Sequence, residues 1–515
     1  MRTKIVECVP NFSEGQDQGV IDEITRAIKS TPGVSLLGVD PGSSTNRTVY
    51  TFVGSPDAVI QGALNAARVA YKRIDMTKHK GEHARLGALD VCPFIPVQGV
   101  EMEECVYCAR KFGEKLSAEL NVPAVPCCVC YKLRKAVFFV SDQVVCEQLP
   151  TAQHRPLGGI GQAEWRPDYG PAEFVPQWGA TMSGARKFLI AYNINVLATK
   201  EQAHRIALDI REEGRGKGQP GLLKSIQAVG WWLEESNIAQ VSVNVLDHDI
   251  TPVHVVYEEV SRIAKSLKLA VTGSQIVGVV PLQAILAAAE FYMQKENLFV
   301  LEEDQKVHLA INRLGLNSLA AFDPAERIIE YMLPDDRLGP LAQKTLAQFI
   351  HVVGARTPTP GGGSVAAAVA SLGAALGAMV GKMTYGKRQW ERYDDQMRQL
   401  IPIMHHTMDE LLPMVDADTG AFNDYMAAHK LPKNTPEEEE VREAAMQAGL
   451  KKAIAVPLGV ARSVSKLWDT TKELASIINI GARADLQVLK EIEEYREEAI
   501  KGCAEVLSIL EKRLS

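Results

Sequence analysis

The chain has 515 residues, of which 46% are hydrophobic and 23% are charged, and this composition excludes an intrinsically disordered protein. The formal net charge of −7 argues against a general nucleic-acid binder, and nine cysteines are too few for a disulfide framework in a chain of this length. The length itself predicts about three domains.

The first part of the chain alternates between strand and helix patterns. Hydrophobic periodicity and turn residues predict strands at 4–9, 34–40, 47–54 and 88–96, with helices at 17–30 and 56–74. The resulting order, β-α-β-β-α-β, is that of the ferredoxin-like split unit. We assign residues 1–187 to this first subdomain.

The same order of elements then repeats. From Phe188 the sequence predicts strands at 188–197, 225–234, 238–247 and 269–279, with helices at 200–213 and 252–267. We therefore expect a second α/β subdomain at 188–333 that faces the first, with a ligand groove between the two.

The remainder of the chain has a different character. A polar linker at 334–340 precedes patterns that are helical to the end, which predicts an all-α bundle at 341–515. The apolar run Val365–Val380 is too short to cross a bilayer, so we expect an interior helix and no membrane span. Glycines at four-residue spacing in this helix predict a tightly packed helix pair; they are Gly373, Gly377 and Gly381. Because no signal-peptide pattern opens the chain, we expect a cytoplasmic protein.

One loop has a reactive composition. It lies between the helix at 56–74 and the strand at 88–96, and it reads His79-Lys80-Gly81-Glu82-His83-Ala84-Arg85-Leu86-Gly87. Histidine can both accept and donate a proton near neutral pH, and glycine allows close approach of a ligand. The alternative interpretation is a solvated turn with surface histidines.

A second candidate site lies in the helical part. The loop Pro360-Gly361-Gly362-Gly363-Ser364 leads directly into a helix, whose free N–H groups can bind a negative charge. Asp416 and Asp418 follow on a later helix, where Asp418 shares one face with Phe422 and Tyr425. A carboxylate among aromatic rings is partly desolvated, which favours its proton-donating form, although the residue could equally be a surface aspartate.

The cysteines do not predict a metal site. Cys105 and Cys108 have no second pair at zinc-finger spacing and fall in a helical pattern, which predicts two neighbouring helix positions. We also interpret Cys127, Cys128 and Cys130 as unpaired thiols, and we expect no bound metal.

Several motifs together carry a family resemblance. Besides the loop at 79–87, they are Val6-Glu7-Cys8-Val9-Pro10-Asn11-Phe12-Ser13-Glu14-Gly15, Ser44-Thr45-Asn46-Arg47-Thr48-Val49-Tyr50, Phe174-Val175-Pro176, Trp178-Gly179-Ala180, Pro360–Ser364 and Val415–Asp418. In this order, over most of the chain, they resemble formiminotransferase-cyclodeaminase, the bifunctional folate enzyme of histidine breakdown.

The resemblance implies an activity and a set of site residues. A formimino group would move from N-formimino-L-glutamate to N5 of tetrahydrofolate, and the product would then cyclise to 5,10-methenyltetrahydrofolate with release of ammonia. His83 and Asp418 match the catalytic residues of the two steps. The segment that matches the family's folate contacts is Gly170, Pro171, Ala172, Glu173, Phe174, Val175, Pro176, Gln177, Trp178 and Gly179, and we expect it to present ring faces to the pterin.

The resemblance also implies partners, and we infer a set of supporting residues. Tetrahydrofolate, with a polyglutamate tail, is a co-substrate, and the family forms a homo-oligomeric ring of dimers in the cytoplasm, with association to the Golgi and the cytoskeleton. We give supporting roles to Asp40, Arg47, His79, Glu82, Gly361, Gly362, Gly363 and Ser364.

Two segments depart from the family pattern, at about 125–162 and after residue 488. The first would leave the edge of a sheet unpaired, and the second shortens the helical bundle by about one helix. Two alternatives therefore remain open. One is a partly active or inactive relative that binds folate or serves as a scaffold; the other is a transferase whose helical domain serves oligomerisation alone.

Overall fold

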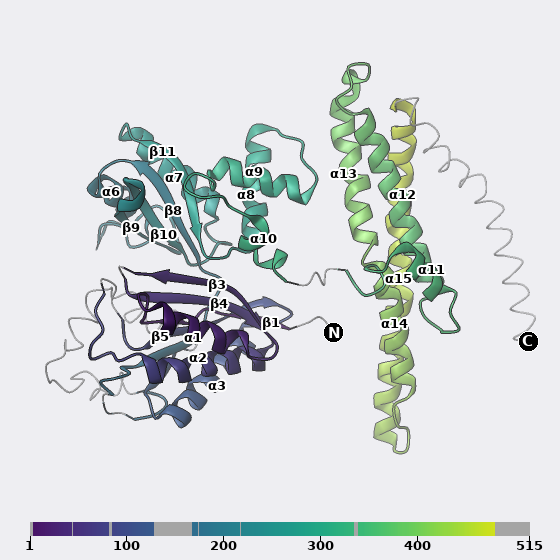
Figure 1. The fold of residues 1–515 in the computed structure, drawn as a ribbon. Helices are drawn as coiled ribbons and strands as arrows, with labels where there is room; N and C mark the ends of the chain where they lie inside the picture. The colour runs from purple at the N-terminus through teal and green to yellow at the C-terminus, as the bar shows by residue number, and fades with distance from the viewer. Residues whose placement is uncertain are drawn as a thin grey trace, which may run out of the picture. The chain divides into compact units, whose positions relative to one another are not determined.

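The computed structural model describes residues 4–43, 45–81, 85–127, 167–171, 173, 175–216, 218–333 and 338–478. The chain separates into two compact units, residues 1–334 and residues 335–515. The first unit contains both sheets, and the described part of the second unit is helical (Figure 1).

The first sheet and its helices follow the predicted order with three additional strands. The strands are β1 (Ile5–Cys8), β2 (Asn11–Phe12), β3 (Val34–Gly42), β4 (Arg47–Gly54), β5 (Leu89–Gln98), β6 (Ala124–Cys127) and β7 (Thr181–Ala185), and the helices are α1 (Gln18–Lys29), α2 (Pro56–Arg73) and α3 (Met102–Leu120). The sequence analysis missed β2, β6 and β7. Strand β7 pairs in parallel with both β5 and β6, so it extends the sheet beyond β5.

One face of this sheet is covered by α1, α2 and α3, which lie side by side (Figure 1). The core between the sheet and the helices contains Tyr50, Phe52, Phe94 and Phe112, all fully buried. Cys105 and Cys108 are free, buried positions of α3, as predicted. The alternation of apolar residues along β4 therefore places one set of its side chains in this core and the other set on the opposite face.

The second sheet repeats the pattern. It consists of β8 (Ile190–Leu197), β9 (Ile226–Leu233), β10 (Ile238–Val245) and β11 (Ala270–Val277), in the spatial order β11-β8-β10-β9, with all neighbours antiparallel. The helices of this part are α6 (Lys200–Ile210), α7 (Val253–Ser266), α8 (Leu282–Glu296), α9 (Glu303–Leu314) and α10 (Pro324–Arg327), with short 3-10 helices η2 (Glu234–Ser236) and η3 (Ile329–Tyr331).

The two halves of the first unit share an apolar cluster. Ile5 and Val53 lie on the face of the first sheet that α1, α2 and α3 leave uncovered, and they pack with Val279 and Ile329 of the second half. All four side chains are buried. Burial of this face is what a sheet with helices on one side requires.

A buried histidine in α7 predicts a pH dependence of stability. His254 is 8% exposed and stacks on Phe291 with ring centroids 4.5 Å apart, and within the described residues its Nδ1 has no hydrogen-bond partner. Burial lowers the pKa of His254 to about 4, with a smaller opposing effect of Glu258. The unfolded chain binds this proton more readily than the folded chain. The contribution of the neutral His254 ring to the free energy of unfolding is therefore complete above about pH 6.5 and is lost as the pH falls towards 4.

We therefore expect the urea midpoint of the chain to fall between about pH 7 and about pH 5, by an amount equivalent to at most roughly 2 kcal/mol and less where solvent screens the ring. In His254→Phe, which keeps the stacking and removes the titration, this decrease should be smaller. An equal decrease in both proteins would contradict the assignment.

The second unit is built on long helices. They are α11 (Leu346–Val353), α12 (Gly362–Thr384), α13 (Asp394–Leu411), α14 (Met414–His429) and α15 (Pro436–Ile477), with a 3-10 helix η4 (Glu391–Tyr393). Helix α12 contacts α13, α14 and α15. Two glycines of its small-residue stripe permit the close packing on α13, because a Cβ atom at Gly377 would lie 2.8 Å from Met404 and one at Gly381 would lie 2.5 Å from Ile401.

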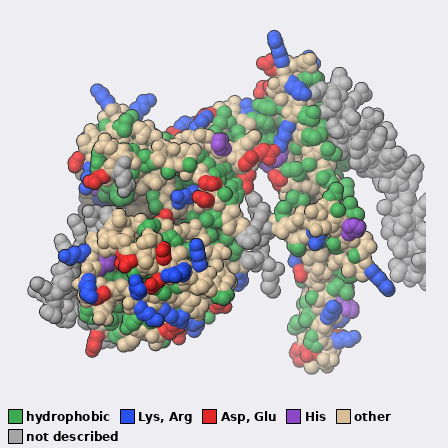
Figure 2. Space-filling model, in the orientation of Figure 1, with side chains coloured by type: hydrophobic (Ala, Val, Ile, Leu, Met, Phe, Trp, Pro, Cys, Tyr) green, Lys and Arg blue, Asp and Glu red, His purple; other side chains and the backbone are tan. Residues whose placement is uncertain are grey.

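Helix α12 is long and apolar enough to cross a bilayer by length and composition, a test that the core helices of soluble proteins also pass. Its contacts with three other helices favour the core role. The helical unit nevertheless exposes hydrophobic side chains (Figure 2), among them Val369 and Leu372 of α12 and Ile454 and Leu458 of α15.

Candidate functional sites

The loop that follows α2 is held by the turn between β3 and β4. Asn46 lies in this turn with a φ of 47°, a left-handed conformation that asparagine tolerates better than most residues. Its side chain accepts a hydrogen bond from Gly15 N (2.9 Å) and donates one to Lys80 O (2.8 Å). The turn therefore fixes the start of the loop.

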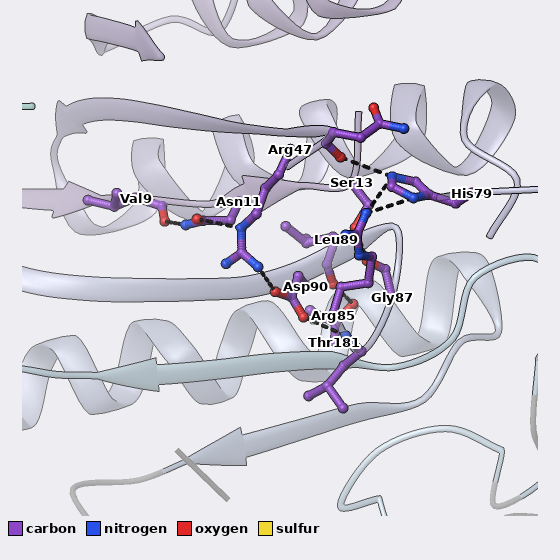
Figure 3. A network of polar contacts seen from close by, with 12 residues as sticks. Val9, Asn11, Ser13, Arg47, His79, Arg85, Gly87, Leu89, Asp90 and Thr181 are labelled. Atoms are coloured by element: carbon purple, nitrogen blue, oxygen red, sulfur yellow. Dashed lines mark hydrogen bonds and ion pairs between the residues drawn. The ribbon is translucent and has the colours of Figure 1, made fainter. Parts of the chain in front are cut away.

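His79 is oriented through both ring nitrogens (Figure 3). Its Nε2 lies 3.0 Å from Asn46 O, and its Nδ1 lies 2.7 Å from Nη1 of Arg85. The carbonyl of Asn46 only accepts, so the proton of the neutral ring is assigned to Nε2. Nδ1 then accepts from Nη1 of Arg85, which also lies 3.1 Å from Nε2. Burial, followed by the positive charge of Arg85, lowers the pKa of His79, which favours this neutral form. The predicted supporting role of His79 is consistent with this fixed ring.

A buried ion pair lies on the sheet beneath the loop. Arg47 of β4 donates through Nη1 to Oδ2 of Asp90 on β5, and the two side chains are 13% and 7% exposed (Figure 3). Arg47 also donates through Nε to Asn11 (3.1 Å), and the second oxygen of Asp90 accepts from Leu86 N (2.7 Å). The charge of Arg47, to which we gave a supporting role, is thus paired with a carboxylate of the protein.

The end of the predicted folate segment lies against this loop. Ala180 N donates to Leu86 O (3.0 Å), and Ala88 N donates to Trp178 O (2.8 Å). Gly179 has a φ of 79°, and a Cβ atom there would lie 2.1 Å from Leu86 O, so glycine is required at this contact. Met76 N also donates to Gln177 O (3.0 Å). Two segments about ninety residues apart in sequence therefore meet at one place.

The prediction that this segment presents ring faces is wrong for Trp178. Its indole is 1% exposed, donates from Nε1 to Thr181 Oγ1 (3.0 Å) and lies 5.9 Å from the ring of Tyr71. A large apolar ring beside a sheet is stabilised by burial, so this side chain belongs to the core.

The other predicted residues of this region are placed as follows. Asp40 lies on β3 with its pKa raised by burial, an effect that Arg327 of α10 partly offsets. Gly170 has a φ of 86° and lies against Val122 and Ser117. Pro171, Glu173, Val175, Pro176 and Gln177 are described and at least partly exposed. Glu82, His83, Ala172 and Phe174 lie outside the described residues.

The second unit brings its two predicted motifs together. Ser364, in the first turn of α12, donates to Oδ2 of Asp418 on α14 from its backbone N (2.9 Å) and from its Oγ (3.3 Å). Ser364 Oγ also lies 3.1 Å from Thr419 Oγ1. A carboxylate at the start of a helix is stabilised by the free N–H groups and the helix dipole. The observed contacts of Asp418 are thus polar, whereas its helix face predicted aromatic neighbours.

Glycine at position 363 allows this approach. A Cβ atom at Gly363 would lie 2.1 Å from Oδ1 of Asp418, whereas at Gly362 it would meet open space. Gly361 is the N-cap residue of α12. Of the three glycines, Gly363 therefore has a steric role at the carboxylate.

Asp416 has a role that the sequence analysis did not assign. Its two carboxylate oxygens accept from Leu341 N (2.8 Å) and Ala342 N (2.9 Å), and Gly339 packs directly against it. Asp416 therefore fixes the end of the linker to α14, and it does not share the contacts of Asp418.

Two further residues of the first site were missed. Asn46 had a sequence signal, because asparagine in a short polar turn between strands often marks a left-handed position. Asp90 is a single acidic residue in the apolar run of β5, and a buried carboxylate in a strand requires a partner. Among the described residues, no three His, Cys, Asp or Glu side chains are grouped as a metal site would require.

Three family models match successive parts of the chain. The N-terminal subdomain of the formiminotransferase domain matches residues 5–186, the formiminotransferase domain matches residues 191–334, and the family described as formiminotransferase-cyclodeaminase matches residues 345–504.

Curated relatives agree with these matches. The chain is 58% identical to formimidoyltransferase-cyclodeaminase of Rattus norvegicus, over 94% of this chain and 89% of that protein. It is 54% identical to formimidoyltransferase-cyclodeaminase of Gallus gallus, over 99% of both chains. Glutamate formimidoyltransferase of Streptococcus pyogenes is 36% identical over 59% of this chain and 99% of its own length. Identity at this level over nearly the whole length shows that the chain belongs to the formimidoyltransferase-cyclodeaminase family.

Proposed function

We propose that this protein is a bifunctional folate enzyme of histidine breakdown. It transfers the formimino group of N-formimino-L-glutamate to N5 of tetrahydrofolate, and it then closes the product to 5,10-methenyltetrahydrofolate with release of ammonia. One observation carries the proposal: hydrogen bonds join residues 86–88 to residues 178–180 in the first unit, and Ser364 to Asp418 in the second. Relatives named for both activities, which match almost all of the chain, support it.

We assign the transferase step to two ferredoxin-like subdomains, 1–187 and 188–333, and the cyclodeaminase step to residues 341–515 after a linker at 334–340. The sheet topology supports the ferredoxin-like assignment. In the first sheet the strands of the β-α-β-β-α-β unit lie in the order β5-β1-β4-β3, and in the second they lie in the equivalent order β11-β8-β10-β9.

In the transferase step, N5 of tetrahydrofolate attacks the amidine carbon of N-formiminoglutamate. The bond from this carbon to the glutamate nitrogen breaks, and that nitrogen takes up a proton as it leaves. We assign the proton transfers to His83, which would take the proton of N5 and return one to the leaving nitrogen. The neutral ring of His79 and the carboxyl of Asp40, whose pKa burial raises, keep the supporting roles that we gave them.

Folate binding is assigned to residues 170–179, where the buried ring of Trp178 supports the segment from the core. Glu82 and Arg47 remain in supporting roles, Arg47 through its pair with Asp90. We expect the polyglutamate form of tetrahydrofolate to be the better co-substrate, and we propose no bound metal.

In the cyclodeaminase step, N10 of the folate attacks the formimino carbon, a methenyl bridge forms and ammonia leaves. Asp418 would donate the proton to the departing nitrogen. Both hydrogen bonds from Ser364 reach Oδ2, so we assign proton transfer to Oδ1. Glycine at position 363 would keep the approach to this oxygen open, and Gly361 and Gly362 keep supporting roles at the start of α12.

We further infer that the protein forms a homo-oligomer, a ring of dimers, in the cytoplasm with association to the Golgi and the cytoskeleton. The apolar side chains exposed on α12 and α15 support self-association, because a soluble monomer rarely exposes so many of them on neighbouring helices. The location rests on the family resemblance alone.

One mixed assay tests the function and its alternatives. The purified chain is given tetrahydrofolate and N-formiminoglutamate, and glutamate and ammonia are followed separately. We expect both products. Glutamate alone would leave a transferase whose helical domain serves oligomerisation, and neither product from a folded chain would leave a folate-binding or scaffold protein.

A further inference from the structure

Three residues connect the two ends of the loop that carries His83. Asn46 holds the first end, through its side chain to Lys80 O and through its backbone carbonyl to the ring of His79. Asp90 holds the other end through its hydrogen bond from Leu86 N. Arg47 follows Asn46 in the chain and is paired with Asp90, so the residues that hold the two ends of the loop are connected to each other (Figure 3).

We propose that Asn46, Arg47 and Asp90 form a brace that positions this loop for the transferase reaction. The three are positioning residues, since each acts through the loop. The proposal rests on the proposed function for its kinetic part, although the contacts of the brace stand independently of the reaction.

Burial makes the brace rigid. Asn46 is 9% exposed and Asp90 is 5% exposed, so their hydrogen bonds are protected from competing water. The loop also packs closely on the turn, because a Cβ atom at Gly81 would lie 2.3 Å from Thr45 O. Hydrogen bonds made in such surroundings fix a geometry more firmly than hydrogen bonds on an open surface.

The length of the loop explains why both ends matter. Five residues separate Lys80 from Leu86, and a chain extends by at most about 3.3–3.6 Å per residue. With both ends held, Lys80 and Leu86 have fixed positions on the sheet and its turn. With one end released, a displacement of about 1 Å is enough to lower a catalytic rate about a hundredfold.

The first variants remove the hydrogen bond from the Asn46 side chain to Lys80 O and leave the backbone conformation of the turn unchanged. Asn46→Gly keeps the left-handed conformation and loses both side-chain bonds. Asn46→Asp keeps an acceptor for Gly15 N and places a carboxylate oxygen opposite Lys80 O, where it cannot donate. The matched control is Asn237→Gly, since Asn237 has a similar φ of 52° in the turn between β9 and β10.

Two readouts are used on the full chain. We expect kcat for glutamate release to fall about ten- to a hundredfold in both Asn46 variants, with KM for each substrate changed less than about threefold. Trypsin cleavage after Lys80, followed by mass spectrometry, should become several-fold faster. Asn237→Gly should match the wild type in both measurements, and its thermal midpoint serves as the reference for the Asn46 variants.

Asp90 provides the test of the other end. Asp90→Asn keeps an acceptor for Leu86 N, whereas Asp90→Ala removes it, so the asparagine variant should retain severalfold more kcat than the alanine variant. Equal activity in the two variants would overturn this half of the brace. Wild-type kcat together with wild-type cleavage in Asn46→Gly would overturn the other half.

Failure of the proposed function gives a different result. If the wild-type chain releases no glutamate, the cleavage rate after Lys80 still decides the brace. Faster cleavage in Asn46→Gly than in Asn237→Gly supports it, and equal cleavage overturns it.

Discussion

Replacing Asp418 with asparagine should stop ammonia release while glutamate release continues, so that 5-formiminotetrahydrofolate accumulates. Asparagine keeps the size of the side chain and an oxygen that can accept from Ser364 N, and it removes the acidic proton. Loss of a general acid typically lowers a rate by about 10²- to 10⁴-fold, and we expect the cyclisation step to fall within this range.

The measurement follows glutamate, ammonia and the folate species in one reaction mixture. Asp424→Asn is the matched control, since Asp424 is an exposed aspartate of the same helix that pairs with Lys452. The control should release both products at wild-type rates. Normal ammonia release by Asp418→Asn would remove Asp418 from the proposed mechanism.

The second large effect is expected at His83. In His83→Ala, glutamate release should fall by about 10²- to 10⁴-fold, because one residue carries the proton from N5 and supplies the proton to the leaving nitrogen. Ammonia release from added 5-formiminotetrahydrofolate should persist, since that step is assigned to the other unit.

Tetrahydrofolate binding to His83→Ala, measured by equilibrium dialysis, should remain close to that of the wild type. His308→Ala is a suitable control because His308 is an exposed residue of α9 in the same unit. If His83→Ala turns over at the wild-type rate, the proton transfers belong to another residue, and His79 becomes the first candidate.

The sequence was sufficient to predict most regular elements of the first unit. Strand β4 was predicted at 47–54 and is observed at Arg47–Gly54, and α2 was predicted at 56–74 and ends at Arg73. These segments have clear apolar periods, and their termini carry residues with a strong local preference, such as Ser55 and Pro56 at the start of α2. The start of α15 carries the same kind of local signal, with Thr435 as the N-cap and Pro436 in the first turn.

The missed strands lack such local signals. Strand β2 has two residues and exists only because β4 and β5 pair with it, and β7 is stabilised by parallel pairing with β5 and β6. Pairing between distant segments is a tertiary property that local periodicity does not contain. The burial of Trp178 has the same origin, since it depends on the core beneath the segment.

The sequence motifs of the candidate sites were predictable, but most contacts between their residues were not. Ser364 and Asp418 were each singled out, but their hydrogen bond joins residues 54 positions apart. The polar contacts of Asp418 follow from the packing of α14 against the start of α12, which no helix-face argument on α14 includes. The roles of Asn46 and Asp90 were likewise not predictable, because each role depends on hydrogen-bond partners that are distant in the sequence.

The hydrogen bonds of Asp416 decide where the chain can be divided for separate expression of its halves. A fragment that begins after Ala342 would lack the backbone N–H groups of Leu341 and Ala342, which donate hydrogen bonds to the two oxygens of this carboxylate. A fragment that begins at Leu338 keeps those groups and the close contact of Gly339. The longer fragment should therefore be the more soluble and better folded form of the helical unit. The two fragments differ only by the few linker residues that contact Asp416.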